Sequence, residues 1–373
     1  MEKVVYIFGA GFSAPLGLPV MNNFISKSKD MFFNSNKSNN YDYFKNIFNM
    51  IENNSYIKNF ISSDLFNIEE LLSILEMGCS IGVSEINTEN FKNYIKDVIK
   101  FYTPKNDYRI EDTLITNWNI HLFGKNKLIQ LKKQEKLLDD WRNFPFDKKD
   151  LITLYYIFFS YLFNLRIERQ DKITSTSRMV DSSKSYSIIT LNYDEILENY
   201  IEFINSKLNI NENLKLDKSY DNNDHDSVKY AKLHGDISSE IILPTWSKNI
   251  TATIKDIWNL SYNILKDANH IRIIGYSLPP TDNYVRYLFS NSFRDSKNLK
   301  KIDVITLDPS SEVEKRYNEL FIFPNFNFKN GDFKEFLLSL YPPELFQQHE
   351  SRRSYIEFHD SILENKHQLY MSK

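Results

Sequence analysis

Cysteine is almost absent from this sequence of 373 residues, in which Cys79 is the only one. A single cysteine excludes an intramolecular disulfide, and it also excludes a zinc site built from several cysteines. The sequence has no signal-peptide pattern, because its N-terminus enters an apolar, strand-like run directly. These features together predict a cytoplasmic protein without a zinc site.

Long apolar runs and a strong net charge are lacking as well. The longest apolar run, Leu151 to Leu165, is shorter than the ~20 residues that a membrane-spanning helix needs, and we interpret it as a buried or subunit-interface helix. The formal net charge is only -3, which gives no electrostatic reason to expect nucleic acid or an anionic membrane as the main partner. A local basic groove remains an open alternative.

The sequence does contain enough apolar material for a large core, since 42% of its residues are hydrophobic. Short apolar runs that end in glycine or polar residues occur near the N-terminus and again from Tyr186 onward, and they are typical of buried parallel strands. The stretch between them has helical periodicity. The strand-like runs are Val4 to Phe8, Tyr186 to Leu191, Val228 to Leu233, His270 to Gly275 and Lys301 to Asp308.

We therefore predict an α/β fold, a doubly wound parallel Rossmann-like sheet with a large helical insertion after its first βα unit. Residues 1–30 and 184–345 would form the sheet domain, residues 31–183 the helical insertion, and residues 346–373 a C-terminal helical tail. Within these parts we expect a charged helix from Lys127 to Trp141 and a polar loop from Asn209 to Ser227.

The first strand-end motif is GAGFSAPLGLP, from Gly9 to Pro19. Gly9 and Gly11 permit a tight turn and let backbone N–H groups approach a diphosphate. Ser13 could bond a phosphate or cap a helix, and Pro19 is well placed to begin the next helix. Because Gly17 comes too late for the standard dinucleotide fingerprint, a purely structural turn is an equal alternative.

Two further motifs, TLNYDE and KLHGD, carry an asparagine and a histidine at strand ends. The amide of Asn192 can hold a ribose hydroxyl or orient a water, while Asp194 can cap the helix that follows. Ordinary loop and cap roles are the alternative for both residues. His234 precedes a glycine in the expected crevice and suits an acid/base group, because imidazole titrates near neutrality. Asp236 could orient this histidine or cap a helix.

The last two strand ends carry GYSLPPTD and LDP. Gly275 ends one strand, Ser277 could contact a phosphate, and Asp282 would cap the helix beginning at the next residue. The carboxylate of Asp308 could accept a hydrogen bond from a ribose or an adenine, or simply cap a helix. Since ligands of open α/β sheets bind beyond the carboxyl ends of the strands, these residues predict a nucleotide pocket.

In this order, GAGFS…G-x-P, T-x-N-Y-D, L-H-G and GYSLPPTD resemble the sirtuin-like family, closest to its branch of bacterial NAD-consuming antiviral-defence proteins. The resemblance covers about residues 1–30 and 186–340. It implies catalysis by Asn192, beside the nicotinamide ribose, and by His234, as general base or ribose-orienting group. The NAD⁺-binding residues that it implies are Gly9, Ala10, Gly11, Ser13, Pro19, Asp194, Gly275, Ser277, Asp282 and Asp308.

The sequence also departs from the family's protein deacylases. These follow the glycine loop with G-I-P-D-F-R and carry a four-cysteine zinc module after the histidine. Here the corresponding residues run from Gly17 to Asn22 as GLPVMN, and one cysteine cannot build the module. Both the acyl-peptide platform and the deacylation chemistry are therefore in doubt.

The resemblance thus implies an NAD⁺ glycohydrolase that forms nicotinamide and ADP-ribose as the effector of a bacterial antiphage, abortive-infection system. Two alternatives stay open: an NAD-dependent protein deacylase or ADP-ribosyltransferase on the same scaffold, and a catalytically silent nucleotide-sensing scaffold subunit. The missing cysteines argue against deacylation. The presence of both Asn192 and His234 argues against a silent scaffold.

Unrestrained NAD⁺ hydrolysis would kill the host cell, so we expect the resting protein to be held inactive. The apolar segment Leu151 to Leu165 exceeds what one small sheet edge can cover. We therefore expect a homo-oligomer joined through the insertion and the C-terminal helix. The resemblance adds a separate partner protein, such as a HerA-type ATPase or a phage-derived activator.

Overall fold

The computed structural model describes most of the chain. The described residues are 1–34, 42–55, 68–82, 88–104, 148–170, 173–179, 182–207, 209–210, 213–219, 227–242, 252–340 and 353–373. The charged helix expected from Lys127 to Trp141 lies outside these ranges, so its prediction is not tested.

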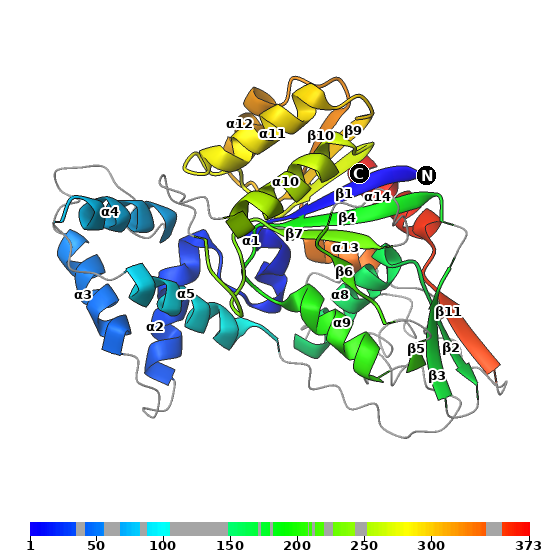
Figure 1. Cartoon of the computed structure of the whole chain (residues 1–373), viewed down its shortest axis with the longest axis horizontal. Helices are drawn as coiled ribbons and strands as arrows, with labels where there is room; N and C mark the ends of the chain where they lie inside the picture. The colour runs from blue at the N-terminus through cyan, green and yellow to red at the C-terminus, as the bar shows by residue number, and fades with distance from the viewer. Residues whose placement is uncertain are drawn as a thin grey trace.

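A seven-stranded parallel sheet forms the centre of the described structure, with the strand order β10-β9-β8-β1-β4-β7-β6 (Figure 1). The first strand lies in the middle and pairs in parallel with β4 on one side and β8 on the other. The doubly wound parallel α/β fold predicted from the sequence is therefore confirmed. The strands are β1 (Glu2–Phe8), β4 (Lys184–Thr190), β6 (Leu216–Asp217), β7 (Val228–Lys232), β8 (His270–Ile274), β9 (Lys301–Thr306) and β10 (Phe326–Asn330).

Helices cover both faces of this sheet, because alternate residues of its strands point to opposite sides. In β1, Val5 and Ile7 join one apolar core, whereas Tyr6 and Phe8 join the other. The helices on the Val5 face are α10 (Ala252–Lys266), α11 (Asn283–Asp295) and α12 (Glu312–Leu320). Those on the Tyr6 face are α8 (Lys148–Leu162), α9 (Ile196–Lys207), α13 (Phe333–Ser339) and α14 (Asp360–Ser372).

The apolar run from Leu151 to Leu165 forms most of α8, and it is buried along its whole length. Phe158 packs edge-on against Tyr6 of β1, with 5.4 Å between the ring centroids. The prediction of a buried helix is confirmed. The premise that this segment exceeds what the sheet can cover is wrong, because the chain itself covers the helix. Among the described helices, none combines the length and apolarity that crossing a bilayer requires.

The described part of the insertion contains more than helices. Four helices stand beyond the carboxyl ends of the central strands, to the left in Figure 1: α2 (Phe24–Asn34), α3 (Asp42–Ser55), α4 (Ile68–Ser80) and α5 (Thr88–Tyr102). A second sheet has the order β11-β2-β3-β5. Its strands are β2 (Leu165–Gln170), β3 (Ile173–Arg178), β5 (Asn209–Ile210) and β11 (Arg353–Glu357).

The second sheet, together with β6 of the central sheet, corrects three sequence predictions, which placed helices throughout the insertion, only helices in the C-terminal tail, and a loop from Asn209 to Ser227. The tail does contain the predicted helical structure in α14. The hairpin sequences LRIERQ and ITSTSR and the tail strand RSYIE are polar, so no apolar run revealed them. The two-residue strands β5 and β6 both lie within the expected loop.

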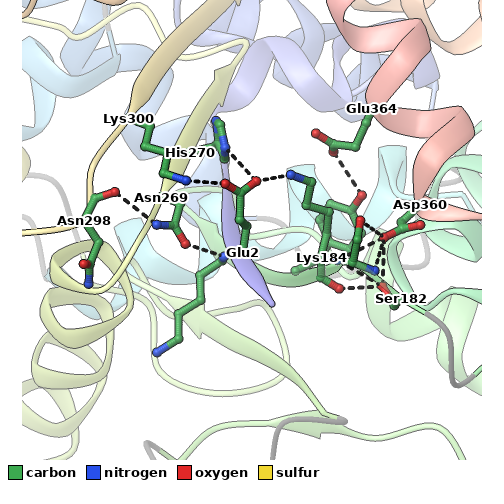
Figure 2. Close-up of polar contacts among 12 residues, drawn as sticks. Glu2, Ser182, Lys184, Asn269, His270, Asn298, Lys300, Asp360 and Glu364 are labelled. Carbon is green, nitrogen blue, oxygen red and sulfur yellow. Dashed lines mark hydrogen bonds and ion pairs between the residues drawn. The ribbon is translucent and has the colours of Figure 1, made fainter.

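Polar contacts hold the amino-terminal ends of the parallel strands, which lie away from the strand-end motifs (Figure 2). Asp360 at the start of α14 accepts hydrogen bonds from the Ser182 hydroxyl (3.0 Å) and from the Lys184 backbone N–H (3.0 Å). Glu2 in turn pairs with Lys184 and Lys300. The last helix is thereby attached to the first residues of the sheet, at the edge away from the strand-end motifs.

Candidate functional site

The strand-end motifs begin at one level of the sheet. Ile274, Phe8, Thr190 and Lys232 stand side by side in the register of β8, β1, β4 and β7. The motifs GAGFS and GYSLPPTD start directly after this row, and TLNYDE and KLHGD start within it, at Thr190 and Lys232. Asn192 and His234 therefore follow neighbouring strands at the same distance from this row, as the sequence predicted for parallel strands.

The glycines of the first motif let two loops pack on one another. The N–H of Gly9 donates to the carbonyl of Ile274 (2.9 Å), and that of Gly11 donates to the carbonyl of Gly275 (2.8 Å). A Cβ on Gly275, whose φ is +65°, would lie 2.1 Å from the backbone nitrogen of Phe12. These two N–H groups bond carbonyls here rather than facing a phosphate, so the phosphate role of the loop stays a prediction.

Asn192 is joined to the first motif through Ser13. Its Nδ2 donates to the carbonyl of Gly9 (2.9 Å) and to Ser13 Oγ (3.0 Å). Ser13 Oγ donates in turn to Asp194 Oδ2 (2.7 Å), and Asp194 Oδ1 accepts from the N–H of Ile196 (3.3 Å). Asp194 thus caps α9, as predicted. The Ser13 hydroxyl holds the asparagine loop in place.

Burial raises the pKa of Asp194, although the hydrogen bond from Ser13 and the charge of Lys232 act in the opposite direction. Lys232 is itself buried, and its ammonium donates to the carbonyl of Asp194 (2.7 Å) and to Glu198 Oε1 (3.0 Å). Sequence analysis missed these two contacts of Lys232. A lysine inside an apolar strand run was the signal that could have revealed them, since buried lysines need partners.

A small cavity with room for about one water molecule is lined in part by the loop that carries Asn192 and Asp194. Its walls combine polar groups of the Asn192 loop and α9 with aromatic rings from the core. The lining residues are Phe8, Phe12, Phe159, Thr190, Asn192, Asp194, Ile196, Leu197, Glu198 and Tyr230.

His234 is only 5% exposed and lies between a backbone carbonyl and a carboxylate. Its Nδ1 is 3.2 Å from the carbonyl oxygen of Leu191, and its Nε2 is 3.6 Å from Asp282 Oδ2. The prediction that Asp236 orients this histidine is wrong. The Asp236 carboxylate instead accepts from the N–H of Ser238 (2.9 Å), and Asp282 is the carboxylate beside the imidazole.

Asp282 occupies the N-cap position of α11, but its side chain makes no capping bond, which corrects the prediction. Its Oδ2 accepts from the hydroxyl of Tyr276 (3.1 Å). Asp308 takes the capping alternative, because its Oδ2 accepts from the N–H of Glu314 (2.8 Å) in the first turn of α12. Its predicted contact with a nucleotide is not tested.

Two further predicted residues are Ser277 and Pro19. The backbone carbonyl of Ser277 accepts from Arg316 Nη2 (3.0 Å), and nothing tests a phosphate contact of its side chain. Pro19 precedes the 3₁₀ turn Met21–Asn23, and α2 begins only at Phe24, so this proline does not start the helix as predicted. Within the described ranges, no three histidine, cysteine, aspartate or glutamate side chains gather as metal ligands would.

A family model described as the SIR2-like domain matches residues 186–324 of the chain. This part of the chain is therefore similar to the SIR2-like family, which supports the sirtuin-like resemblance seen in the motifs, while the antiviral-defence branch stays a prediction. The matched region includes Asn192, His234 and Asp282 and leaves out the glycine loop after β1.

Solved sirtuin structures are similar to the chain at low sequence identity. The structure of Sir2Tm bound to a propionylated peptide is 11% identical over 90% of each chain, with a TM-score of 0.31. A complex of Sir2 with a p53 peptide and NAD⁺ is 11% identical over 90% of each chain, with a TM-score of 0.32. At such low scores these similarities carry no argument about the site. Among curated proteins, none matches the chain.

Proposed function

We propose that this protein is an NAD⁺ glycohydrolase, which cleaves NAD⁺ with water into nicotinamide and ADP-ribose. The observation that carries the proposal is the equivalent placement of Asn192 and His234 after neighbouring strands, within the part of the chain that matches the SIR2-like domain. Both residues lie at the carboxyl edge of the sheet, where ligands of open α/β folds bind.

The departure of the leaving group needs no acid catalysis from the protein. Nicotinamide departs as a neutral molecule from a cationic pyridinium, so the bond between its nitrogen and the ribose C1′ breaks without a general acid. The site must stabilise an oxocarbenium-like ribose and deliver water to C1′. The proton that this water loses needs a base.

Asn192 and His234 suit these two tasks. Since Nδ2 of Asn192 is committed to Gly9 and Ser13, Oδ1 is the atom that would accept from a water or a ribose hydroxyl. The imidazole of His234 would take the proton of the attacking water. The glycine loop and the rim residues Ser277 and Asp308 would hold the rest of the dinucleotide.

Beyond the reaction, we propose that the protein acts in the cytoplasm as the effector of a bacterial antiphage system. The motif resemblance supports this role. It also supports control by assembly and by a partner such as a HerA-type ATPase or a phage-derived activator. The homo-oligomer stays a prediction that can no longer rest on α8, because that helix is covered within the chain.

Product analysis tests the proposed reaction. The purified chain is incubated with NAD⁺, with and without an acetyl-lysine peptide, and the products are separated by liquid chromatography and identified by mass. Equal amounts of nicotinamide and ADP-ribose, formed without the peptide, would support hydrolysis. ADP-ribose transferred to protein, or acetylated ADP-ribose formed only with the peptide, would replace the proposal with one of the two alternatives.

A further inference from the structure

We propose that Asp282 is the positioning residue of His234: its carboxylate faces the basic nitrogen of the imidazole and stabilises the imidazolium formed when His234 takes a proton. This inference rests on the proposed function, in which His234 acts as the base. It assigns Asp282 a task that neither the capping role nor the dinucleotide contact expected from the sequence would give it.

The hydrogen bonding of His234 defines which nitrogen is the base. A backbone carbonyl only accepts hydrogen bonds, so the contact with the carbonyl of Leu191 places the proton of the neutral imidazole on Nδ1. The other nitrogen, Nε2, is then the basic atom. It faces Oδ2 of Asp282 across 3.6 Å.

Asp282 is built into this position by its loop. Its side chain is buried, and its Oδ2 accepts from the Tyr276 hydroxyl rather than from the first turn of α11. The carbonyl of Tyr276 accepts in turn from the hydroxyl of Tyr317 on α12 (2.9 Å). Leu278, between Tyr276 and Asp282, has a φ of +49°. A non-glycine residue in this region costs free energy, which is typical of functional sites.

The proposed step balances in protons and bonds. As the oxygen of water bonds to the ribose C1′ and the bond to nicotinamide breaks, Nε2 of His234 takes one proton of that water. The imidazolium then lies beside the Asp282 carboxylate, and the proton passes to solvent after the products form. A carboxylate this close favours the charged imidazole and so strengthens the base.

Few other charged or titratable groups are described beside this imidazole. Tyr193, in the loop after β4, has its ring centroid 6.1 Å from that of His234, and its hydroxyl donates to the carbonyl of Ile242 (3.1 Å). Asp236, on the loop of His234 itself, bonds the N–H of Ser238 and lies 4.0 Å from Lys232 Nζ. From the side of α11, the group that faces the imidazole is Asp282.

The test replaces Asp282 by Asn, which keeps the size and removes the charge. We expect kcat for NAD⁺ cleavage to fall about tenfold or more with KM changed less than about threefold, because the substitution weakens the base and leaves the binding of NAD⁺ nearly intact. The acid limb of the pH–rate profile should move to lower pH, since the imidazolium no longer has its counter-charge.

A histidine NMR titration gives a second measurement that does not need activity. The signal of His234 in the full chain is assigned by its disappearance in His234→Gln, and its titration midpoint should move to lower pH in Asp282→Asn. Asp332→Asn is the matched control. Asp332 is also an N-cap residue, and its carboxylate accepts from the N–H of Lys334 (2.9 Å), but no contact joins it to His234 in the described structure.

An unchanged His234 midpoint in folded Asp282→Asn would overturn the pairing. A moved midpoint with an unchanged kcat and pH profile would overturn the positioning role. If Asp282→Asn does not fold, Asp282→Ser, which retains a preferred N-cap residue, takes its place under the same criteria. If the wild-type chain transfers ADP-ribose to protein and not to water, the proposed function fails, while the titration still decides the pairing.

Discussion

At the scale of single residues, Asn192 links two motifs that are far apart in the sequence. Its side-chain amide holds the carbonyl of Gly9 and the hydroxyl of Ser13, and Ser13 holds Asp194, 181 residues further along the chain. This connection fixes the loop after β4 against the loop after β1. The amide oxygen of Asn192 is thereby aimed by contacts from both loops.

Replacing Asn192 by Ala should lower NAD⁺ cleavage by about two orders of magnitude or more, because the variant lacks a positioned electrostatic group. Folding should be retained, since the side chain lies at a strand end and contributes little to the apolar core. Asn199→Ala is the control, because that amide lies on α9 and donates to the carbonyl of Pro104. Initial rates and circular dichroism check both variants, and a fully active Asn192→Ala would refute the role.

The glycines can be tested in the same way. Gly275→Ala should lower the free energy of unfolding and abolish cleavage, because the added Cβ would lie 2.1 Å from the backbone of Phe12. Gly17 also has a positive φ, but a Cβ there meets nothing within 4 Å. Gly17→Ala should therefore cost only about 1–2 kcal/mol. Urea unfolding compares the two, and equal losses of stability would contradict the packing argument.

At the scale of elements, α14 is attached to the sheet by buried charges. Arg272 of β8 donates to both carboxylate oxygens of Glu364 (2.8 and 2.6 Å) and to the hydroxyl of Tyr6 (2.7 Å). His367 is 2.9 Å from Asp303 through its Nε2. With Asp360 at the edge shown in Figure 2, these contacts attach the whole helix to the strands.

This attachment makes stability depend on pH. Burial, and then the charge of Arg272, lower the pKa of His367 from its ordinary 6.5 to about 4. A lowered folded pKa means that the contribution of His367 is complete above pH 6.5 and is lost as the pH falls through 4. The free energy of unfolding should therefore decrease as the pH is lowered from 6.5 to 4.

The variant His367→Gln separates this contribution from the rest. Its amide can still donate to Asp303 but does not titrate, so the loss of stability between pH 6.5 and 4 should be smaller than in the wild type. Urea unfolding at several pH values measures the difference. An identical pH dependence in both proteins would show that His367 does not contribute.

Elements with a clear apolar pattern in the sequence could be predicted, and elements without one could not. The apolar strands ending in glycine, asparagine or histidine were found because burial on both faces leaves an unbroken run of apolar residues. The strand ITSTSR was missed because it has no such run. The pairing of His234 with Asp282 could not be foreseen, since it depends on how the loop after β8 places Asp282 beside a histidine that follows β7.

At the scale of the whole molecule, the chain contains a region similar to the SIR2-like domain, but its sequence lacks the parts that the sirtuin deacylases carry. One cysteine cannot build a zinc module, and VMN from Val20 to Asn22 replaces the usual Asp-Phe-Arg. We expect no O-acetyl-ADP-ribose when an acetyl-lysine peptide is added with NAD⁺, and no effect of the peptide on nicotinamide release. Mass spectrometry of the products checks this, and detection of the acetylated product would favour the deacylase.

The proposed hydrolase site is tested most directly by comparing nicotinamide release from NAD⁺ by the wild-type chain and by His234→Ala. Both proteins are first shown to be folded, and the variant should retain the circular dichroism of the wild type. We predict steady release of nicotinamide with equimolar ADP-ribose by the wild type, and a rate at least about a hundredfold lower for the variant. Equal rates of nicotinamide release by the two proteins would contradict the assignment of this site as a hydrolase.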